Sequence, residues 1–203
     1  MRACYHLPAY GLAMPPRAET SGRVRIIGGT LRGSKLEVPD APGLRPTPDR
    51  VRETLFNWLM PVISGARCLD LFAGTGALGI EALSRGAATV DFVETDARLA
   101  DLLRANLARL KQAARVTRSD AQRFLAETNE AYDIAFVDPP FGADLWTPAA
   151  QALEAHGRLQ RNAWINVESP ADATPALPAH WTVHRESQAG AVRYALYRRS
   201  DKL

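Results

Sequence analysis

The sequence predicts an α/β fold built around a mostly parallel, seven-stranded sheet, and three features of the chain indicate it. Five short apolar segments alternate with segments of helical periodicity, a pattern typical of parallel strands joined by right-handed crossovers. Two further strand-like segments near the C-terminus have no helix between them, so we expect them to pair antiparallel as a hairpin. Two shorter strands near the N-terminus are expected to form a small β-hairpin appendage.

The elements are expected in the following order along the chain. The appendage has strands at 24–27 and 34–38, and a proline-rich linker follows it. Thr47 is the expected N-cap of a first helix, whose apolar face carries Val51, Leu55, Trp58 and Leu59. Alternating strands and helices then follow at 67–72, 77–84, 89–94, 96–110, 115–118, 121–126, 132–137, 146–156 and 163–168, and the terminal hairpin at 181–186 and 192–198.

Length and composition suit one folded domain. The chain has 203 residues, of which 46% are hydrophobic, enough for a full core. We expect a disordered extension over 1–22, the appendage and linker over 23–46, and the main domain over 47–203. Apolar runs fall short of the ~18 residues that span a bilayer, and residues 1–22 lack the pattern of a signal peptide. A soluble, cytoplasmic protein is therefore expected.

Cysteine and histidine usage bounds the chemistry. Cys4 and Cys68 are too few for a disulfide framework, and Cys68 lies in an apolar strand, where we expect a buried small hydrophobe. The four histidines and two cysteines show no metal-ligand spacing, so no metal cofactor is expected.

Positive charge is concentrated in the N-terminal part of the chain. The net charge is only +3, but residues 1–60 hold nine of the 25 basic residues and five of the 22 acidic ones. A basic appendage suits contacts with nucleic-acid phosphates, and we expect Arg25, Arg32 and Lys35 to make them. The alternative is that these charges form an ordinary solvated face.

The most informative motif is Asp138-Pro139-Pro140-Phe141, which follows the predicted strand at 132–137. The carboxyl end of a parallel strand is where open α/β sheets bind ligands. Asp138 supplies an acceptor, the prolines a stiff turn with outward carbonyls, and Phe141 a flat apolar ring. Such a set suits a planar heterocycle with an exocyclic amine, because its N–H groups need acceptors and its ring can stack. The competing interpretation is a proline turn that ends a strand, with Asp138 as a polar cap.

A glycine-rich turn joins the predicted strand at 67–72 to the next helix. Gly74, Gly76 and Gly79 match the dinucleotide fingerprint G-x-G-x-x-G, and Glu94 lies about 20 residues further on, where a ribose-binding acid belongs. This motif alone is equally compatible with a nicotinamide-dependent oxidoreductase.

Asp70 favours a different ligand at this turn. It precedes the first glycine by four residues, where a carboxylate would repel a pyrophosphate but could hold a cation. S-adenosylmethionine is such a cation, with an α-ammonium, a sulfonium and no phosphate. Hydride transfer also has no evident use for the motif at Asp138, so the two motifs together favour methyl transfer.

The chain resembles the bacterial 16S ribosomal RNA guanine-N2 methyltransferases (RsmD-type), which use S-adenosylmethionine. The resemblance covers roughly residues 22–200 and is carried by ordered blocks, which read RIIGG, RGSKL, GLRPTPDRVRETLFNWL, LDLFAGTGALG and FVDPPF. It implies a Rossmann-like class I methyltransferase fold, and a monomer that acts on 16S rRNA within an assembled or assembling small ribosomal subunit.

The resemblance also implies a cofactor site. Glu94 would accept hydrogen bonds from both ribose hydroxyls. Asp120 would accept from the adenine amine, although it is also a natural N-cap for the helix that follows. The other implied contacts are Asp70, Ala73, Gly74, Thr75 and Gly76 at the amino-acid end, the Ala121 N–H at the adenine ring, and Thr47 and Arg50 over the methionine moiety.

Three residues are expected to act on the guanine. The lone pair of the N2 amine is delocalised into the ring, and hydrogen bonds from its two protons to Asp138 and the Pro139 carbonyl would localise and aim it. Phe141 would stack on the base after it leaves its own stack.

Other functions stay open at this stage. The same chemistry could serve a DNA adenine or a protein glutamine, although many such enzymes have Asn and Tyr where this chain has Asp138 and Phe141. A nicotinamide oxidoreductase is a second alternative. A non-catalytic RNA-binding or assembly factor is a third, and the intact motif argues against it.

Overall fold

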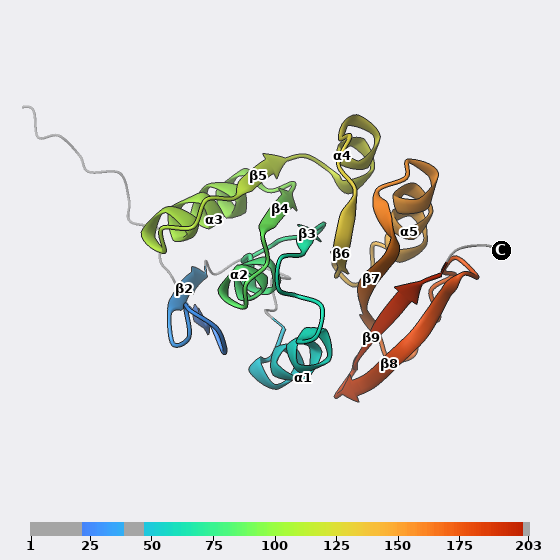
Figure 1. Ribbon diagram of the computed structural model, residues 1–203, viewed down its shortest axis with the longest axis horizontal. Helices are drawn as coiled ribbons and strands as arrows, with labels where there is room; N and C mark the ends of the chain where they lie inside the picture. The colour runs from blue at the N-terminus through green and yellow to red at the C-terminus, as the bar shows by residue number, and fades with distance from the viewer. Residues whose placement is uncertain (1–21, 39–46, 201–203) are drawn as a thin grey trace, which may run out of the picture.

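The computed structural model describes residues 22–38 and 47–200, which form two sheets and five helices (Figure 1). The expected extension over 1–22 lies outside the described residues except for its last residue. The linker over 39–46 also lies outside them. The elements are β1 (Gly22–Arg25), β2 (Lys35–Val38), α1 (Asp49–Leu59), β3 (Arg67–Asp70), α2 (Ala77–Ser84), β4 (Thr89–Glu94), α3 (Ala97–Arg109), β5 (Arg115–Arg118), α4 (Ala121–Glu127), β6 (Tyr132–Val137), α5 (Trp146–Ala155), β7 (Leu159–Pro170), β8 (Trp181–Ala189) and β9 (Val192–Arg199).

The main sheet confirms the predicted α/β fold. Its strand order is β5-β4-β3-β6-β7-β9-β8, and the antiparallel pair β1-β2 stands apart as the predicted appendage. Strands β3 to β7 are parallel, whereas β9 runs antiparallel between β7 and β8. Strand order reverses between β3 and β6, and open α/β sheets bind ligands at the carboxyl edge of that switch point. Asp70 ends β3 there, and Asp138 follows β6.

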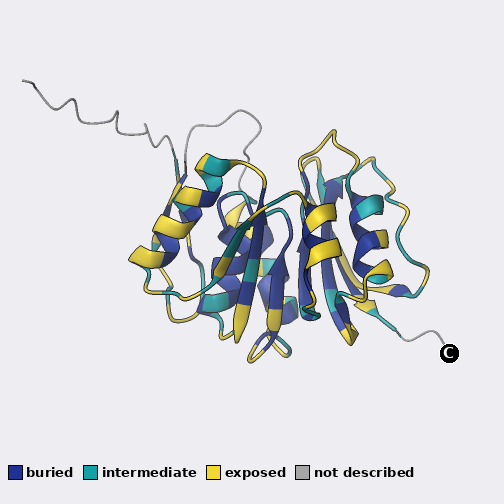
Figure 2. Cartoon of the chain, turned by 90° about the horizontal axis from the view of Figure 1, so that it is seen from above, coloured by how far each residue is buried: buried dark blue, intermediate teal, exposed yellow. Residues whose placement is uncertain are grey.

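Helices cover both faces of the main sheet and enclose a hydrophobic core on each side (Figure 2). Phe92 of β4 and Phe136 of β6 face helices α1, α2 and α3, and the appendage packs into the same core through Ile26 and Leu36. The alternate residues of the strands face α4 and α5, as the pleat of a strand requires. Within the described residues, every helix is too short or too polar to span a bilayer.

Several predicted element boundaries are wrong. Strand β1 spans Gly22–Arg25 rather than the expected 24–27. Strand β3 ends at Asp70 rather than at residue 72, because the chain turns so that Ala73 N–H donates to the Val93 carbonyl (2.9 Å). Strand β7 begins four residues early, at Leu159. Strand β8 continues to Ala189, because β9 supplies ladder partners up to the turn at Gly190.

The predicted N-cap of α1 is also wrong. Pro48 holds the N-cap position without a side-chain hydrogen bond. The Thr47 hydroxyl instead lies 3.4 Å from a carboxylate oxygen of Asp138 and 3.4 Å from one of Glu168. A residue expected to serve its own helix therefore contacts the carboxyl edge of the main sheet.

A buried carboxylate attaches the appendage to the domain. Glu81 of α2 is fully buried and accepts the N–H groups of Ile27 and Gly28, each at 2.8 Å. The Arg85 Nε donates to it at 2.8 Å, and the buried Arg52 guanidinium lies 3.9 Å away. Arg52 also pairs with Asp49 at 2.6 Å. Removing the Glu81 charge therefore takes away the direct ion-pair partner of Arg85 and the acceptor of two appendage N–H groups.

We predict that Glu81→Gln lowers the free energy of unfolding by about 3–5 kcal/mol, the cost of removing one partner of a buried ion pair. Urea denaturation followed by circular dichroism measures it. Glu53→Gln, an exposed acid on α1, is the matched control and should change stability by less than about 0.5 kcal/mol. Equal stability of the two variants would contradict this role for Glu81.

Candidate active site

Four acidic side chains meet at the carboxyl edge of the main sheet. Glu94, Asp70 and Glu168 lie on β4, β3 and β7, and Asp138 directly follows β6, which lies between β3 and β7. Glu94, Asp70 and Glu168 are buried, and Asp138 is partly exposed. Across the described residues, no three His, Cys, Asp or Glu side chains are arranged to hold a metal ion. The four carboxyl groups can attract a cationic ligand in their ionised forms.

The glycine turn lies between two of these acids and is hydrogen-bonded to both. Gly74 N–H donates to Glu94 at 2.7 Å, and Gly79 N–H donates to Asp70 at 2.9 Å. Gly76 starts α2 with φ at 75°. A Cβ on Gly79 would lie 2.2 Å from the Phe92 ring, so this third glycine of the fingerprint allows the helix to pack closely on β4.

Asp70 is poised to change its charge near neutral pH. Burial raises the pKa of its carboxyl to about 7, the Gly79 N–H opposes this rise, and the charges of Asp138 and Glu94 add to it. A cation bound beside Asp70 would favour the ionised form, because opposite charges lower the pKa of a carboxyl.

Glu94 is a rigid acceptor beyond the turn. Besides Gly74 N–H, it accepts the Asp96 N–H at 2.8 Å and the Thr95 hydroxyl at 3.3 Å. These donors fix the carboxylate at the end of β4. Two of them use Oε1 and one uses Oε2, so Oε2 keeps a lone pair for a ligand. The position agrees with the predicted ribose-binding role, which stays a prediction.

The motif at Asp138 forms the rim of the site. Pro139 is buried, and Phe141 is 47% exposed, with its ring centroid 6.1 Å from that of Trp146 at a tilt of 50°. Burial, followed by the charge of Glu168, raises the pKa of Asp138 well above its usual range, and the Thr47 hydroxyl opposes that rise. The motif therefore presents an acceptor and an accessible ring side by side.

The remaining predicted cofactor residues lie around this edge. Ala73 and Thr75 are buried in the glycine turn, and Arg50 is exposed in the first turn of α1. Asp120 is exposed and caps α4 by accepting the Arg123 N–H at 2.9 Å, and Ala121 follows as the first helical residue. The capping role of Asp120 is confirmed, and its role toward an adenine stays a prediction.

The sequence analysis missed Glu168. This side chain is 2% exposed on β7, shares the Thr47 hydroxyl with Asp138, and has one oxygen, Oε1, without a hydrogen-bond partner among the described residues. The sequence feature that could have indicated it is the glutamate within the apolar segment INVES, because a glutamate is rarely buried unless it is paired. The sequence could not show which residue it faces.

Comparison with known proteins identifies relatives over nearly the whole chain. The family described as "Conserved hypothetical protein 95" matches residues 24–198. "Ribosomal RNA small subunit methyltransferase D" of Escherichia coli strain K12 is 54% identical over 186 residues, 91% of this chain and 94% of the relative. The protein of the same name from Haemophilus influenzae is 46% identical over 181 residues, 87% of this chain and 94% of the relative.

Solved structures agree with the fold. The structure of yhhF from Escherichia coli superposes with a TM-score of 0.83 at 53% identity, covering 89% of this chain and 100% of that one. A structure from Haemophilus influenzae gives a TM-score of 0.78 at 43% identity, with 89% and 100% covered. The chain therefore belongs to the conserved hypothetical protein 95 family, the family of the ribosomal RNA small subunit methyltransferase D proteins.

Proposed function

We propose that this protein transfers a methyl group from S-adenosylmethionine to the N2 amine of a guanine in 16S rRNA, as a monomer acting on the small ribosomal subunit in the cytoplasm. The observation that carries the proposal is the juxtaposition at the switch point. The Asp138 acceptor and the accessible Phe141 ring stand beside Asp70, an acid placed for a cation. The relatives named as small-subunit rRNA methyltransferases support the substrate class.

The residues at the edge fit the cofactor by charge and shape. Bound there, S-adenosylmethionine would supply an electrophilic methyl group on a sulfonium. Asp70 would pair with the α-ammonium, and Glu94 would accept the ribose hydroxyls. The backbone N–H at Ala121 would face the adenine ring, beside the exposed Asp120 carboxylate.

Asp138 and Pro139 would orient the nucleophile. The carboxylate and the Pro139 carbonyl accept the two N2 protons, which directs the nitrogen lone pair out of conjugation and toward the methyl donor. Positioning of this kind contributes ~7–11 kcal/mol in well-oriented reactions. Phe141, being 47% exposed, can stack on the extruded base.

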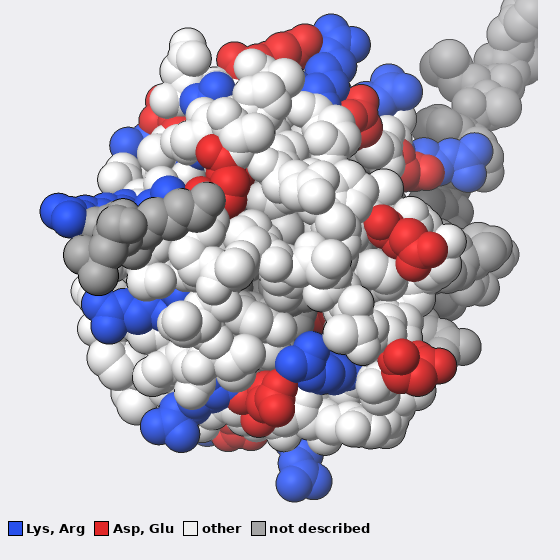
Figure 3. Space-filling view, turned by 90° about the vertical axis from the view of Figure 1, so that its right-hand side faces the viewer, with Lys and Arg blue, Asp and Glu red and all other residues white. Residues whose placement is uncertain are grey.

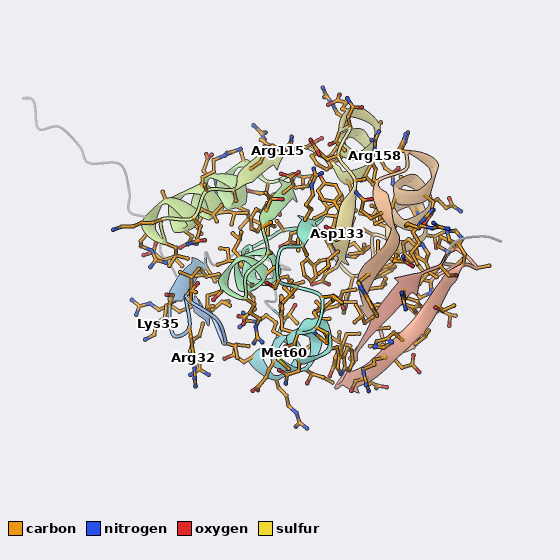
Figure 4. All side chains as sticks on the ribbon, in the orientation of Figure 1. Arg32, Lys35, Met60, Arg115, Asp133 and Arg158 are labelled. Atoms are coloured by element: carbon orange, nitrogen blue, oxygen red, sulfur yellow. The ribbon has the colours of Figure 1, made fainter. Side chains whose placement is uncertain are left out.

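The appendage supplies a basic surface for the RNA backbone. Arg25 and Arg32 line one surface cavity of about 540 Å³, together with Arg85 and the Gly28-Gly29 turn. Arg32 and Lys35 project outward from the appendage (Figure 4). On the face seen in Figure 3, the basic and acidic side chains of the described residues are interspersed rather than gathered by sign.

Methylation by the purified protein tests the proposal. Labelled S-adenosylmethionine is supplied with unmethylated small subunits, free 16S rRNA, adenine-rich DNA or a glutamine peptide, and the products are digested and identified. The proposal predicts label in N2-methylguanosine of 16S rRNA. Label in N6-methyladenine or in glutamine would assign the same chemistry to another substrate, and the absence of label in all four would favour a non-catalytic RNA-binding role.

We predict that Asp138→Ala lowers the single-turnover methylation rate by at least ~10²-fold, the scale for losing one transition-state hydrogen bond. Cofactor affinity, measured by calorimetry, should stay within a fewfold. Asp144→Asn is the matched control, because Asp144 is an exposed acid just after the motif, at a φ of 48° that asparagine tolerates. Near-normal turnover by Asp138→Ala would remove Asp138 from the mechanism.

Cofactor binding should release protons below neutral pH. With its pKa raised to about 7, Asp70 is largely protonated at pH 6 in the free protein, and the α-ammonium favours its ionised form. Affinity should therefore rise between pH 5.5 and 7. Calorimetry at pH 6 in two buffers of different ionisation enthalpy should show release of most of one proton in the wild type. Asp138→Ala should release less, because it lacks one of the charges that raise the pKa of Asp70. A heat independent of buffer would refute this account of Asp70.

We predict that changing Arg25, Arg32 and Lys35 together to Ala flattens the log–log salt dependence of RNA binding by about two to three units. Filter binding across a salt series measures the slope, and cofactor affinity should not change. The control changes Arg123, Arg185 and Arg193, which lie on α4, β8 and β9. If both triple variants keep the wild-type slope, the three appendage charges make no phosphate contacts and form an ordinary solvated face.

A further inference from the structure

The Thr47 hydroxyl joins two carboxylates that the proposed reaction uses unequally. Its Oγ1 atom lies 3.4 Å from Asp138 Oδ2 and 3.4 Å from Glu168 Oε2. A hydroxyl has one proton to donate and lone pairs to accept with. The Thr47 hydroxyl can therefore donate to only one of the two carboxyl groups. It can also accept a hydrogen bond from the other one, provided that this other carboxyl group is protonated.

Glu168 is placed to carry that proton. Its side chain is 2% exposed, whereas Asp138 is partly open to solvent, and the Glu168 Oε1 has no hydrogen-bond partner among the described residues. Burying two unpaired negative charges side by side is costly, and one shared proton removes half of that charge. Pairs of close carboxyl groups share a proton for this reason.

The surroundings of the pair agree with one proton at neutral pH. Burial raises the pKa of Glu168 to about 7, and the negative charge of Asp70 on β3 adds to the rise. Asn166 on β7, Thr47 and the guanidinium of Arg52 on α1 act in the opposite direction. The pKa of Asp138 is raised as well, by burial and then by Glu168 itself.

We propose that Glu168 is a positioning residue that holds a shared proton through the Thr47 hydroxyl, so that Asp138 is the anion facing the substrate amine. This inference rests on the proposed function for the identity of that amine. The order of donors is then Glu168 O–H to Thr47 Oγ1, Thr47 O–H to Asp138, and N2–H to Asp138. If the shared proton were on Asp138 instead of Glu168, Asp138 would be neutral and a weaker acceptor for the N2 proton.

The pair also accounts for the proton that the amine loses. Once the nitrogen carries the methyl group it is cationic, and its N–H bond breaks as a new O–H bond forms on Asp138. The pair passes from one proton and one negative charge to two protons and none. Asp138, the partly exposed member, then returns one proton to solvent.

Carboxyl ¹³C NMR of the free protein tests the shared proton without substrate or cofactor. The Asp138 Cγ and Glu168 Cδ signals should titrate together in two steps at least about one pH unit apart. In Glu168→Gln, whose amide replaces the protonated acid, Asp138 should titrate in one step. A Glu168 that is ionised throughout pH 5 to 8, or that titrates independently of Asp138, would overturn the proposal.

Single-turnover methylation against pH, at saturating cofactor, tests the positioning role. Thr47→Val removes the hydroxyl and keeps the shape of the side chain. The pKa of Asp138 should therefore rise, and the acidic side of the rate–pH profile should move up by about one pH unit. At pH 6.5 this variant should be about tenfold slower, with most of the rate regained at pH 8.5, and Thr47→Ser should restore the profile.

The outcomes separate the two proposals. A Thr47→Val profile that superimposes on the wild type would contradict the positioning role even if guanine methylation is established. Coupled titration of the two carboxyl signals in a protein that methylates no RNA would uphold the shared proton and refute the proposed function. Thermal melts of each variant distinguish loss of folding from loss of positioning.

Discussion

The placement of four carboxylates at one edge of a parallel sheet is the constraint on which the rest of this structure depends. The number of hydrogen-bond donors to each of these acids decreases across the sheet from β4 to β7. Glu94 accepts two backbone N–H groups and a hydroxyl, Asp70 accepts one backbone N–H, and Asp138 and Glu168 share a single hydroxyl. The least satisfied acids lie where the proposed chemistry occurs, which is where a cationic donor and an amine would supply the missing partners.

Arg52 connects this edge to the basic appendage. Its guanidinium is fully buried and donates to the Arg25 carbonyl at 2.8 Å and to the Thr47 carbonyl at 3.2 Å. The same side chain lies near Glu81, which holds the loop between β1 and β2. One buried arginine therefore contacts both the proposed RNA-binding appendage and the segment that carries Thr47, which sets where the RNA backbone would lie relative to the reacting base.

Local patterns predicted the elements well because each depends on neighbours in sequence. The periodicity at 89–94, 115–118 and 132–137 gave strand boundaries that match β4, β5 and β6. Thr47 was misassigned because a threonine before Pro48 and Asp49 has all the local features of an N-cap. Its partners, Asp138 and Glu168, lie 91 and 121 residues away, and Glu168 escaped notice for the same reason. Contacts set by strand order have no signature in a single stretch of sequence.

The most direct measurement of the central claim is mass spectrometry of 16S rRNA nucleosides from a strain that lacks this protein. The account predicts the loss of one N2-methylguanosine per 16S rRNA, restored by the wild-type gene and not by the Asp138→Ala variant. An unchanged N2-methylguanosine content, or the loss of a different modified nucleoside, would contradict it.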